Sequence, residues 1–127
     1  MNINRIFLPI LIFFILIVMG ACSSTPEIEG FDNNHWQNDS HGCDGVRLKQ
    51  AEILINHRDE LIGENQREIT NLLGKPNRHE LYSRSKKAFI YFLSNGPGCE
   101  QELENPDKLV IRFDALGRVK EVVLYKK

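Results

Sequence analysis

Cysteine and histidine side chains are the groups in this 127-residue sequence that could carry nucleophilic or metal chemistry. His35, His41 and Cys43 lie close together and are interleaved with Asp39 and Asp44, so a four-ligand metal site is one interpretation. The spacing matches no established zinc pattern, and such a run is more often a solvated loop. A Cys43 thiolate activated by His41 is a second interpretation, but this spacing alone does not place an imidazole on the sulfur. We expect no metal ligands and no catalytic residues in this segment.

Carboxylates are concentrated in one segment, where Glu100, Glu102 and Glu104 surround Leu103. Such a cluster more often keeps a loop hydrated than performs acid–base work. The run Ser94–Gly96 forms no nucleophile elbow, and the sequence has no glycine loop of the kind that cradles phosphate. No reaction class follows, so we expect a protein that is not an enzyme and needs no cofactor.

The N-terminus has the layout of a secretory signal. Arg5 supplies one positive charge, an apolar run extends from Ile6 to Met19 and is interrupted at Pro9, and small residues follow. A membrane-spanning helix needs about 20 apolar residues, a length that this run does not reach. We predict an export signal at residues 1–21, with a permanent span as the less natural alternative.

The residues Met19, Gly20, Ala21 and Cys22 resemble the lipobox of bacterial lipoproteins. The resemblance implies that Cys22 is the lipidation site, with a diacylglycerol on its thiol and another acyl chain on its freed amine. Two or more acyl chains anchor a protein stably, because each buried methylene contributes about 0.8 kcal/mol. Ser23 follows in place of Asp, which by the same resemblance implies delivery to the cell outer membrane, on its periplasmic or its surface face. An ordinary signal with a chance cysteine is the alternative.

Lipidation of Cys22 would leave Cys43 and Cys99 in a compartment where paired thiols oxidise, so we predict a disulfide between them. Closing so long a loop would stabilise the fold by about 4 kcal/mol in the chain-entropy model. Removal of the signal takes away one positive charge from a chain whose formal net charge is −1. Neither a basic nor an acidic excess results, and we expect no nucleic-acid partner.

Residues 22–43 are rich in Ser, Asn, Asp and Gly and lack a sustained apolar period, which predicts a flexible tether. Phe31 and Trp36 are exceptions, and we expect an aromatic here to dock on the domain, with contact to a partner as the alternative. One domain is predicted at residues 44–127, a length typical of a single compact unit.

Two helices are predicted at the start of this domain. Apolar residues recur every three or four positions over Val46–Leu61, with Asp44 placed to accept the free amides and Gly63 placed to end the helix. The segment Asn65–Gly74 predicts a second helix that begins at its N-cap asparagine and ends at its glycine, with Glu68 as capping-box partner.

Beyond the second helix the pattern predicts an antiparallel sheet. Its strands are expected at Glu80–Ser83, Ala88–Leu93, Leu109–Phe113 and Arg118–Tyr125. Apolar residues on both faces indicate that Ala88–Leu93 is a central strand, and adjacent valines in the last strand indicate a bulge or burial on both faces. A turn is expected at residues 114–117, and a longer loop at residues 95–107 carries Cys99.

The turn expected at residues 83–87 is basic, because it contains Arg84, Lys86 and Lys87. Contact with anionic lipid is one interpretation of these residues. Three basic residues at a turn are more often a solvated tip.

Two short helices followed by an antiparallel meander, behind a lipobox, resemble the BamE-like (SmpA/OmlA) domain of bacterial lipoproteins. The residues that carry the resemblance are Leu61–Gly63, Arg67–Ile69, Leu72–Pro76, Tyr91–Leu93, Leu109, Phe113, Gly117 and Val119. It implies an α+β fold in two layers, with two short N-terminal helices packed on a three- to four-stranded antiparallel sheet (ααβββ). The pair Cys43 and Cys99 and the long loop at residues 95–107 depart from the family pattern.

The resemblance also implies a function. We expect a non-enzymatic lipoprotein that binds or scaffolds another envelope protein, in outer-membrane assembly or integrity, and that meets the membrane through its lipid anchor. An inhibitor or small-ligand-binding module on the same fold is the alternative, and a small metal-dependent or thiol enzyme is the third hypothesis.

Overall fold

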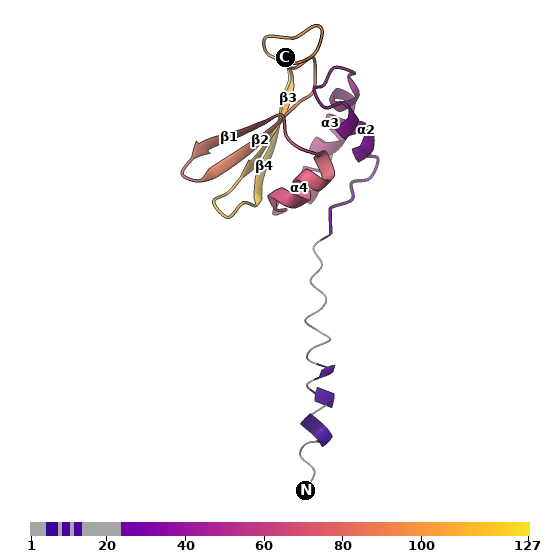
Figure 1. Ribbon diagram of the computed structural model, residues 1–127, viewed down its shortest axis with the longest axis vertical. Helices are drawn as coiled ribbons and strands as arrows, with labels where there is room; N and C mark the ends of the chain where they lie inside the picture. The colour runs from indigo at the N-terminus through magenta and orange to yellow at the C-terminus, as the bar shows by residue number, and fades with distance from the viewer. Residues whose placement is uncertain (1–4, 8, 11, 14–23) are drawn as a thin grey trace.

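The structure is a computed structural model that describes residues 5–7, 9–10, 12–13 and 24–127 (Figure 1). The expected lipobox, Met19–Cys22, lies outside these residues. Within the described part, no helix is long and apolar enough to cross a membrane. The elements of the domain in chain order are α2 (Asn33–Asn38), α3 (Val46–Asn56), the short 3-10 helix η1 (Arg58–Glu60), α4 (Gln66–Leu73), β1 (Arg78–Ser83), β2 (Lys86–Phe92), β3 (Lys108–Phe113) and β4 (Val119–Tyr125).

The four strands form one antiparallel sheet in the order β1-β2-β3-β4, so each strand pairs with its neighbour in sequence. The helices α2, α3 and α4 lie on one side of this sheet, and within the described part no helix covers the other side (Figure 1). The predicted α+β class is confirmed, with a sheet of four strands. The arrangement leaves one face of the sheet free of helices.

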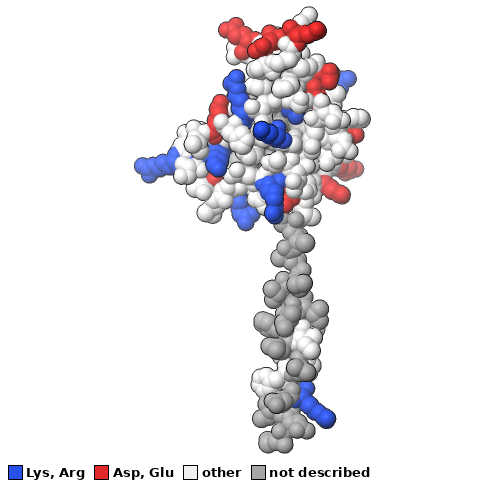
Figure 2. Space-filling model, viewed as in Figure 1, with Lys and Arg blue, Asp and Glu red and all other residues white. Residues whose placement is uncertain are grey.

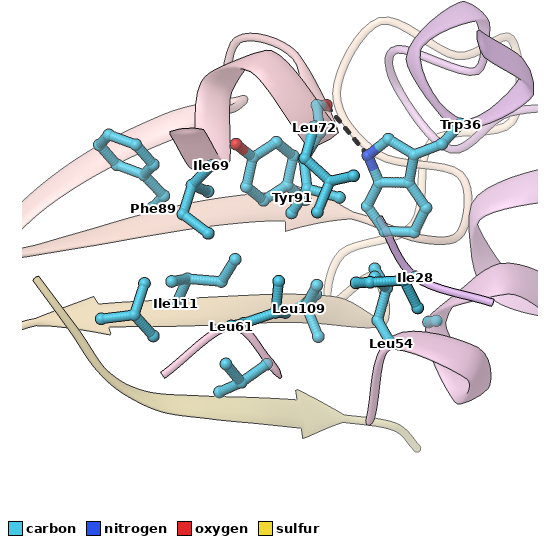
Figure 3. Close-up of a cluster of buried hydrophobic side chains, with 14 of the residues drawn as sticks. Ile28, Trp36, Leu54, Leu61, Ile69, Leu72, Phe89, Tyr91, Leu109 and Ile111 are labelled. Carbon is cyan, nitrogen blue, oxygen red and sulfur yellow. Dashed lines mark hydrogen bonds between the residues drawn. The ribbon is translucent and has the colours of Figure 1, made fainter. Parts of the chain in front are cut away.

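Alternation along the strands divides their apolar side chains between the two faces of the sheet. On the helix side, the strand residues of the core are Phe89, Tyr91, Leu109, Ile111, Phe113, Val119 and Val122, and they pack with Trp36, Leu54, Ile69, Leu72 and Leu73 (Figure 3). The opposite face has a smaller buried cluster of Ala88, Ile90, Phe92 and Val110. Burial of β2 on both faces confirms that it is a central strand.

Helix α4 has the caps that the sequence predicts. The Asn65 side chain accepts a 3.0 Å hydrogen bond from the Glu68 backbone N–H. Gly74 ends the helix with a φ of 77°, a conformation that glycine adopts without a Cβ penalty. The buried Glu68 carboxylate accepts a 3.0 Å hydrogen bond from the Thr25 hydroxyl, which ties the chain at Thr25 to the first turn of α4.

The start of helix α3 differs from its prediction. Gly45 is the N-cap, so Asp44 lies one position too early to cap the helix. Asp39 takes that role from a distance, because its carboxylate accepts from the Asp44 N–H at 3.0 Å and from the Arg47 N–H at 3.1 Å. The prediction that a carboxylate accepts from the free amides of this terminus is therefore correct, but the carboxylate belongs to Asp39 and not to Asp44.

Several element boundaries also shift. Helix α3 ends at Asn56 instead of Leu61, because the chain tightens into η1, and Leu61 reaches the core from the turn beyond. Strand β1 begins at Arg78, earlier than predicted. Strand β4 begins one residue late, because Arg118 forms an isolated bridge with Asn65.

The predicted β3–β4 hairpin is confirmed, with its turn at Asp114–Gly117. The Asp114 carboxylate organises this turn by accepting from the N–H groups of Leu116 at 2.9 Å and Arg118 at 3.1 Å. The strand register shifts between Arg112 and Phe113, so the hairpin contains a bulge, one of the two alternatives that the sequence leaves open.

Part of the segment predicted as a flexible tether belongs to the fold. Within residues 22–43, Ile28 is buried and residues 33–38 form α2. Trp36 is fully buried, as expected of an aromatic that docks, and its Nε1–H donates to the Leu73 carbonyl oxygen at 3.0 Å (Figure 3). The packed domain therefore begins nearer Ile28 than the predicted residue 44, because the core is incomplete without this indole.

Candidate functional site

The face of the sheet that carries no helix presents a patterned surface. Strand pairing places one row of Arg78, Ile90, Val110 and Val123 beside a second row of Glu80, Ala88, Arg112 and Glu121. A third row consists of Phe92, Lys108 and Tyr125. We call these residues, together with Tyr82, the open face.

Three basic side chains of the open face lie over aromatic rings. The distances from charge centre to ring centre are 5.3 Å for Arg78 over Phe92, 5.7 Å for Lys108 over Tyr125 and 5.9 Å for Arg112 over Tyr82. Such stems cover apolar surface while their charges stay in water. This explains why Ala88, Ile90 and Val110 are buried without a helix above them. The apolar floor is thus covered by basic side chains.

Two shallow hollows run along the open face. One, of about 280 Å³, is lined by residues from all four strands, among them Tyr82. The other, of about 320 Å³, lies between the sheet and the loop at residues 95–107, which contributes Leu103. Lys108 and Tyr125 line both hollows. The two hollows therefore adjoin at these residues, and we call them together the open-face groove.

Arg112 holds a polar network together at the centre of the open face. Its guanidinium donates to the Tyr125 hydroxyl and to the Glu121 carboxylate, both at 2.9 Å. These bonds, that to Tyr125 foremost, raise the pKa of Arg112. Arg78 and Lys108 take part in none of the salt bridges of residues 24–127, so their charges are available to a partner.

The wall of the groove is fastened to the helical layer by a disulfide. The structure joins Cys43 to Cys99, whose Cα atoms are 5.6 Å apart. Within the loop, the Leu103 N–H donates to the Asn95 carbonyl oxygen at 2.8 Å, which holds Leu103 over the groove. Because both cysteines are paired, the structure offers no Cys43 thiolate for His41 to activate.

The other candidate ligands do not converge. Among the described residues, no three His, Cys, Asp or Glu side chains are placed to hold a metal ion. His35 pairs instead with the Asp32 carboxylate at 3.0 Å on the surface, and Asp39 caps α3. The acidic run Glu100, Glu102 and Glu104 is exposed at one end of the molecule (Figure 2).

A buried polar network behind the sheet was not predicted from the sequence. Arg47 is only 2% exposed, and its guanidinium donates to the Trp36 carbonyl oxygen and to Asn77 Oδ1, both at 3.0 Å. It also lies 5.0 Å from the centre of the Trp36 ring and 5.6 Å from that of Tyr91. Asn77 Oδ1 accepts a further 2.9 Å bond from the Phe92 N–H, so the network positions the end of β2 beneath the groove.

The charge of Arg47 is stabilised locally although the residue is buried. Burial lowers the pKa of Arg47, and the neighbouring Asp39 carboxylate opposes that shift. Helical periodicity alone places Arg47 on the polar side of its helix with Lys49. Its partners lie 11 and 30 residues away, and no local pattern signals such a contact.

The structure thus brings aromatic, basic and apolar side chains together on the open face. This surface is suited to contact and offers no arrangement that we can assign to a reaction. Comparisons of the chain with family models, with curated proteins and with solved structures find no match.

Proposed function

We propose that the protein is a non-enzymatic lipoprotein, anchored in the outer membrane through Cys22, that binds another envelope protein in its open-face groove. The observation that carries the proposal is the groove itself, which lies on a sheet face that no helix of the described part covers. The lipobox residues support the anchor. The disulfide between Cys43 and Cys99 is of the kind that persists in oxidising compartments.

The shape of the groove favours a protein over a small molecule. Pockets for small ligands are usually about 300–1,000 Å³ and enclose most of their ligand. The two hollows here, of about 280 and 320 Å³, are open and adjoin each other, which suits an extended segment or a loop. Tyrosine and arginine are enriched at the centres of protein interfaces, and Tyr82, Arg112 and Tyr125 occupy the open face.

The role in outer-membrane assembly or integrity is the part of the proposal that rests on the BamE-like resemblance. That resemblance covers the two helices and the sheet that the sequence predicts. In such a role, the anchor holds the domain near the membrane and the groove recruits the partner.

Photocrosslinking in intact cells tests the groove. A photoreactive phenylalanine analogue at Tyr82 or at Tyr125 should give a discrete adduct with one protein, whereas the same analogue at the exposed Ile62 should not. Lys108→Glu should remove the adduct, because it reverses the charge shared by both hollows, and Lys49→Glu on α3 is the matched control. Adducts of equal yield from Ile62, or none from the groove, would overturn the proposal.

The anchor has a separate test. Cys22→Ser should abolish metabolic labelling by a fatty acid and should block cleavage of the precursor, since the lipobox cysteine is the processed residue. If the Cys22→Ser precursor is cleaved normally and the natural chain carries no fatty acid, the segment is an ordinary signal with a chance cysteine.

A further inference from the structure

The turns of both hairpins lie at one end of the domain. In an antiparallel meander, the end of β1 and the start of β2 lie level with the end of β3 and the start of β4. The chain reverses there at residues 84–85 and 114–118. We call residues 81–87 and 114–118 the hairpin-turn end.

Thr25, which is close in sequence to the proposed anchor at Cys22, is held near this end. The isolated bridge between Asn65 and Arg118 and a 2.9 Å bond from the Gly63 N–H to the Val119 carbonyl oxygen place the start of α4 beside the start of β4. One turn along α4, Glu68 binds the hydroxyl of Thr25. Thr25 is therefore held against the first turn of α4, whose start lies beside the β3–β4 hairpin.

The hairpin-turn end exposes apolar side chains. Leu116 is 86% exposed and Leu81 is 74% exposed, the highest values among the large hydrophobic residues within 24–127. Each belongs to a different hairpin. Exposed leucines at two neighbouring turns are unfavourable in water and suited to the boundary between lipid headgroups and acyl chains.

The same end has an uneven charge. Residues 81–87 contain Arg84, Lys86 and Lys87 and no acidic residue, and these three take part in none of the salt bridges of residues 24–127. The Asp114 carboxylate is occupied by the backbone of its own turn. The charge presented by the first hairpin is therefore unneutralised and positive.

The opposite end of the domain carries an acidic loop. Acidic side chains gather at the top of the molecule in Figure 2, and the loop at residues 95–107, which lies at this end, has Glu100, Glu102 and Glu104 exposed. Lys126 and Lys127 lie beside this loop. An anionic bilayer surface repels acidic residues and attracts basic ones. The attraction is worth about 1 kcal/mol for each basic residue near the surface. The basic first hairpin and the acidic loop thus lie at opposite ends of the sheet.

We propose that the hairpin-turn end rests on the bilayer surface that holds the anchor, with Leu81 and Leu116 at the headgroup boundary and the three basic residues against lipid phosphates. This inference rests on the proposed anchor. It orients the domain so that the acidic loop points away from the membrane. The open-face groove then lies along the side of the domain.

Tryptophan probes in the mature, lipidated protein, purified from cells and reconstituted in vesicles, test this orientation. Trp36 is the single natural tryptophan and is fully buried, so its emission is a constant background. Leu116→Trp should shift its emission to the blue and be quenched by brominated phosphatidylcholine mixed with phosphatidylglycerol. Leu103→Trp, in the loop at the far end, is the matched probe and should show neither effect.

Charge reversal tests the basic contribution. Arg84→Glu/Lys86→Glu/Lys87→Glu in the Leu116→Trp background should remove most of the quenching, whereas Lys49→Glu/Arg58→Glu/Lys75→Glu, with the same change in net charge, should not. Flotation with the vesicles monitors the anchor in every sample. A protein that floats without quenching at position 116, or with equal quenching at 103, overturns the orientation alone. A protein that fails to float overturns the anchor and the orientation with it.

Discussion

The indole N–H of Trp36 donates to the carbonyl oxygen of Leu73, the last residue of α4, at 3.0 Å. This bond ties a segment that reads as a linker to the helix whose ends are best marked in the sequence. The Trp36 ring also lies 6.0 Å from the ring of Tyr91 on β2. One side chain thus joins the N-terminal segment to both layers of the fold.

Substitution of Trp36 should measure how much this side chain contributes to the free energy of unfolding. Trp36→Phe keeps an aromatic ring but leaves the Leu73 carbonyl without its donor, and should lower the free energy of unfolding by about 1–3 kcal/mol. Trp36→Ala should lower it by about 3–5 kcal/mol. Urea denaturation followed by circular dichroism gives both values. Leu116→Ala, at an exposed turn, is the control, and a Trp36→Ala effect no larger than the control would contradict the role of the indole.

The distant cap of α3 predicts a contrast between two neighbouring aspartates. Asp39→Ala should lower the free energy of unfolding by about 1–2 kcal/mol, because the amides of Asp44 and Arg47 lose their acceptor. Asp44→Ala should change it by less than about 0.5 kcal/mol, since its side chain is at the surface. Thermal unfolding of the two variants side by side decides the matter. A larger loss of stability in Asp44→Ala than in Asp39→Ala would show that Asp44 caps the helix.

Stability should fall at alkaline pH because of Tyr91. Its hydroxyl donates to the Gly74 carbonyl oxygen at 2.9 Å, and burial raises its pKa, an effect that the Arg47 cation partly opposes. In the unfolded chain a tyrosine loses its proton near pH 10. The contribution of the neutral phenol is therefore complete below that pH and is lost as pH rises toward the folded pKa, by about 1.4 kcal/mol per pH unit.

Urea unfolding at a series of pH values from about 8 to about 11 measures this dependence. Tyr91→Phe should be less stable at neutral pH by about 1 kcal/mol and should show a flatter decline. An equally steep decline in Tyr91→Phe would assign the alkaline sensitivity to other groups.

The disulfide should contribute strongly to stability. Cys43→Ser/Cys99→Ser should lower the free energy of unfolding by about 4 kcal/mol, because the bond closes a long loop, with a sequence separation of 56. Amide hydrogen exchange in residues 95–107 should quicken while α4 stays protected. Reduction of the natural protein should reproduce both effects, and two reactive thiols in the unreduced protein would refute the bond.

The sequence predicts correctly those features that depend on residues close together in the chain. Asn65 and Gly74 mark the ends of α4 because a cap acts within one helical turn, and the β3–β4 hairpin follows from alternation around the turn at Asp114. The burial of β2 on both faces could be read from its continuous apolar run. These features identify the α+β class without knowledge of tertiary contacts.

The contacts that were missed join separate elements of the structure. Asp39 caps a helix that begins beyond it in the chain, and Arg47 finds its place between two rings that helical periodicity cannot bring together. The open face was likewise not identifiable, because its rows exist only once strand register is set and Arg78, Lys108 and Arg112 meet their aromatic partners. A sequence read alone shows these residues as ordinary surface charges.

Pairing of each strand with its sequence neighbour has a consequence for how the chain assembles. Contacts that are close in sequence form fast, because little loop-closure entropy is lost, so we expect the meander and α4 to collapse first. The bonds of the N-terminal segment span much more chain, 37 residues from Trp36 to Leu73 and 56 between the cysteines. In the export that we propose, the chain emerges from its N-terminus onward, so the part that crosses the membrane first must wait for the rest before it is packed. Assembly then finishes where synthesis began.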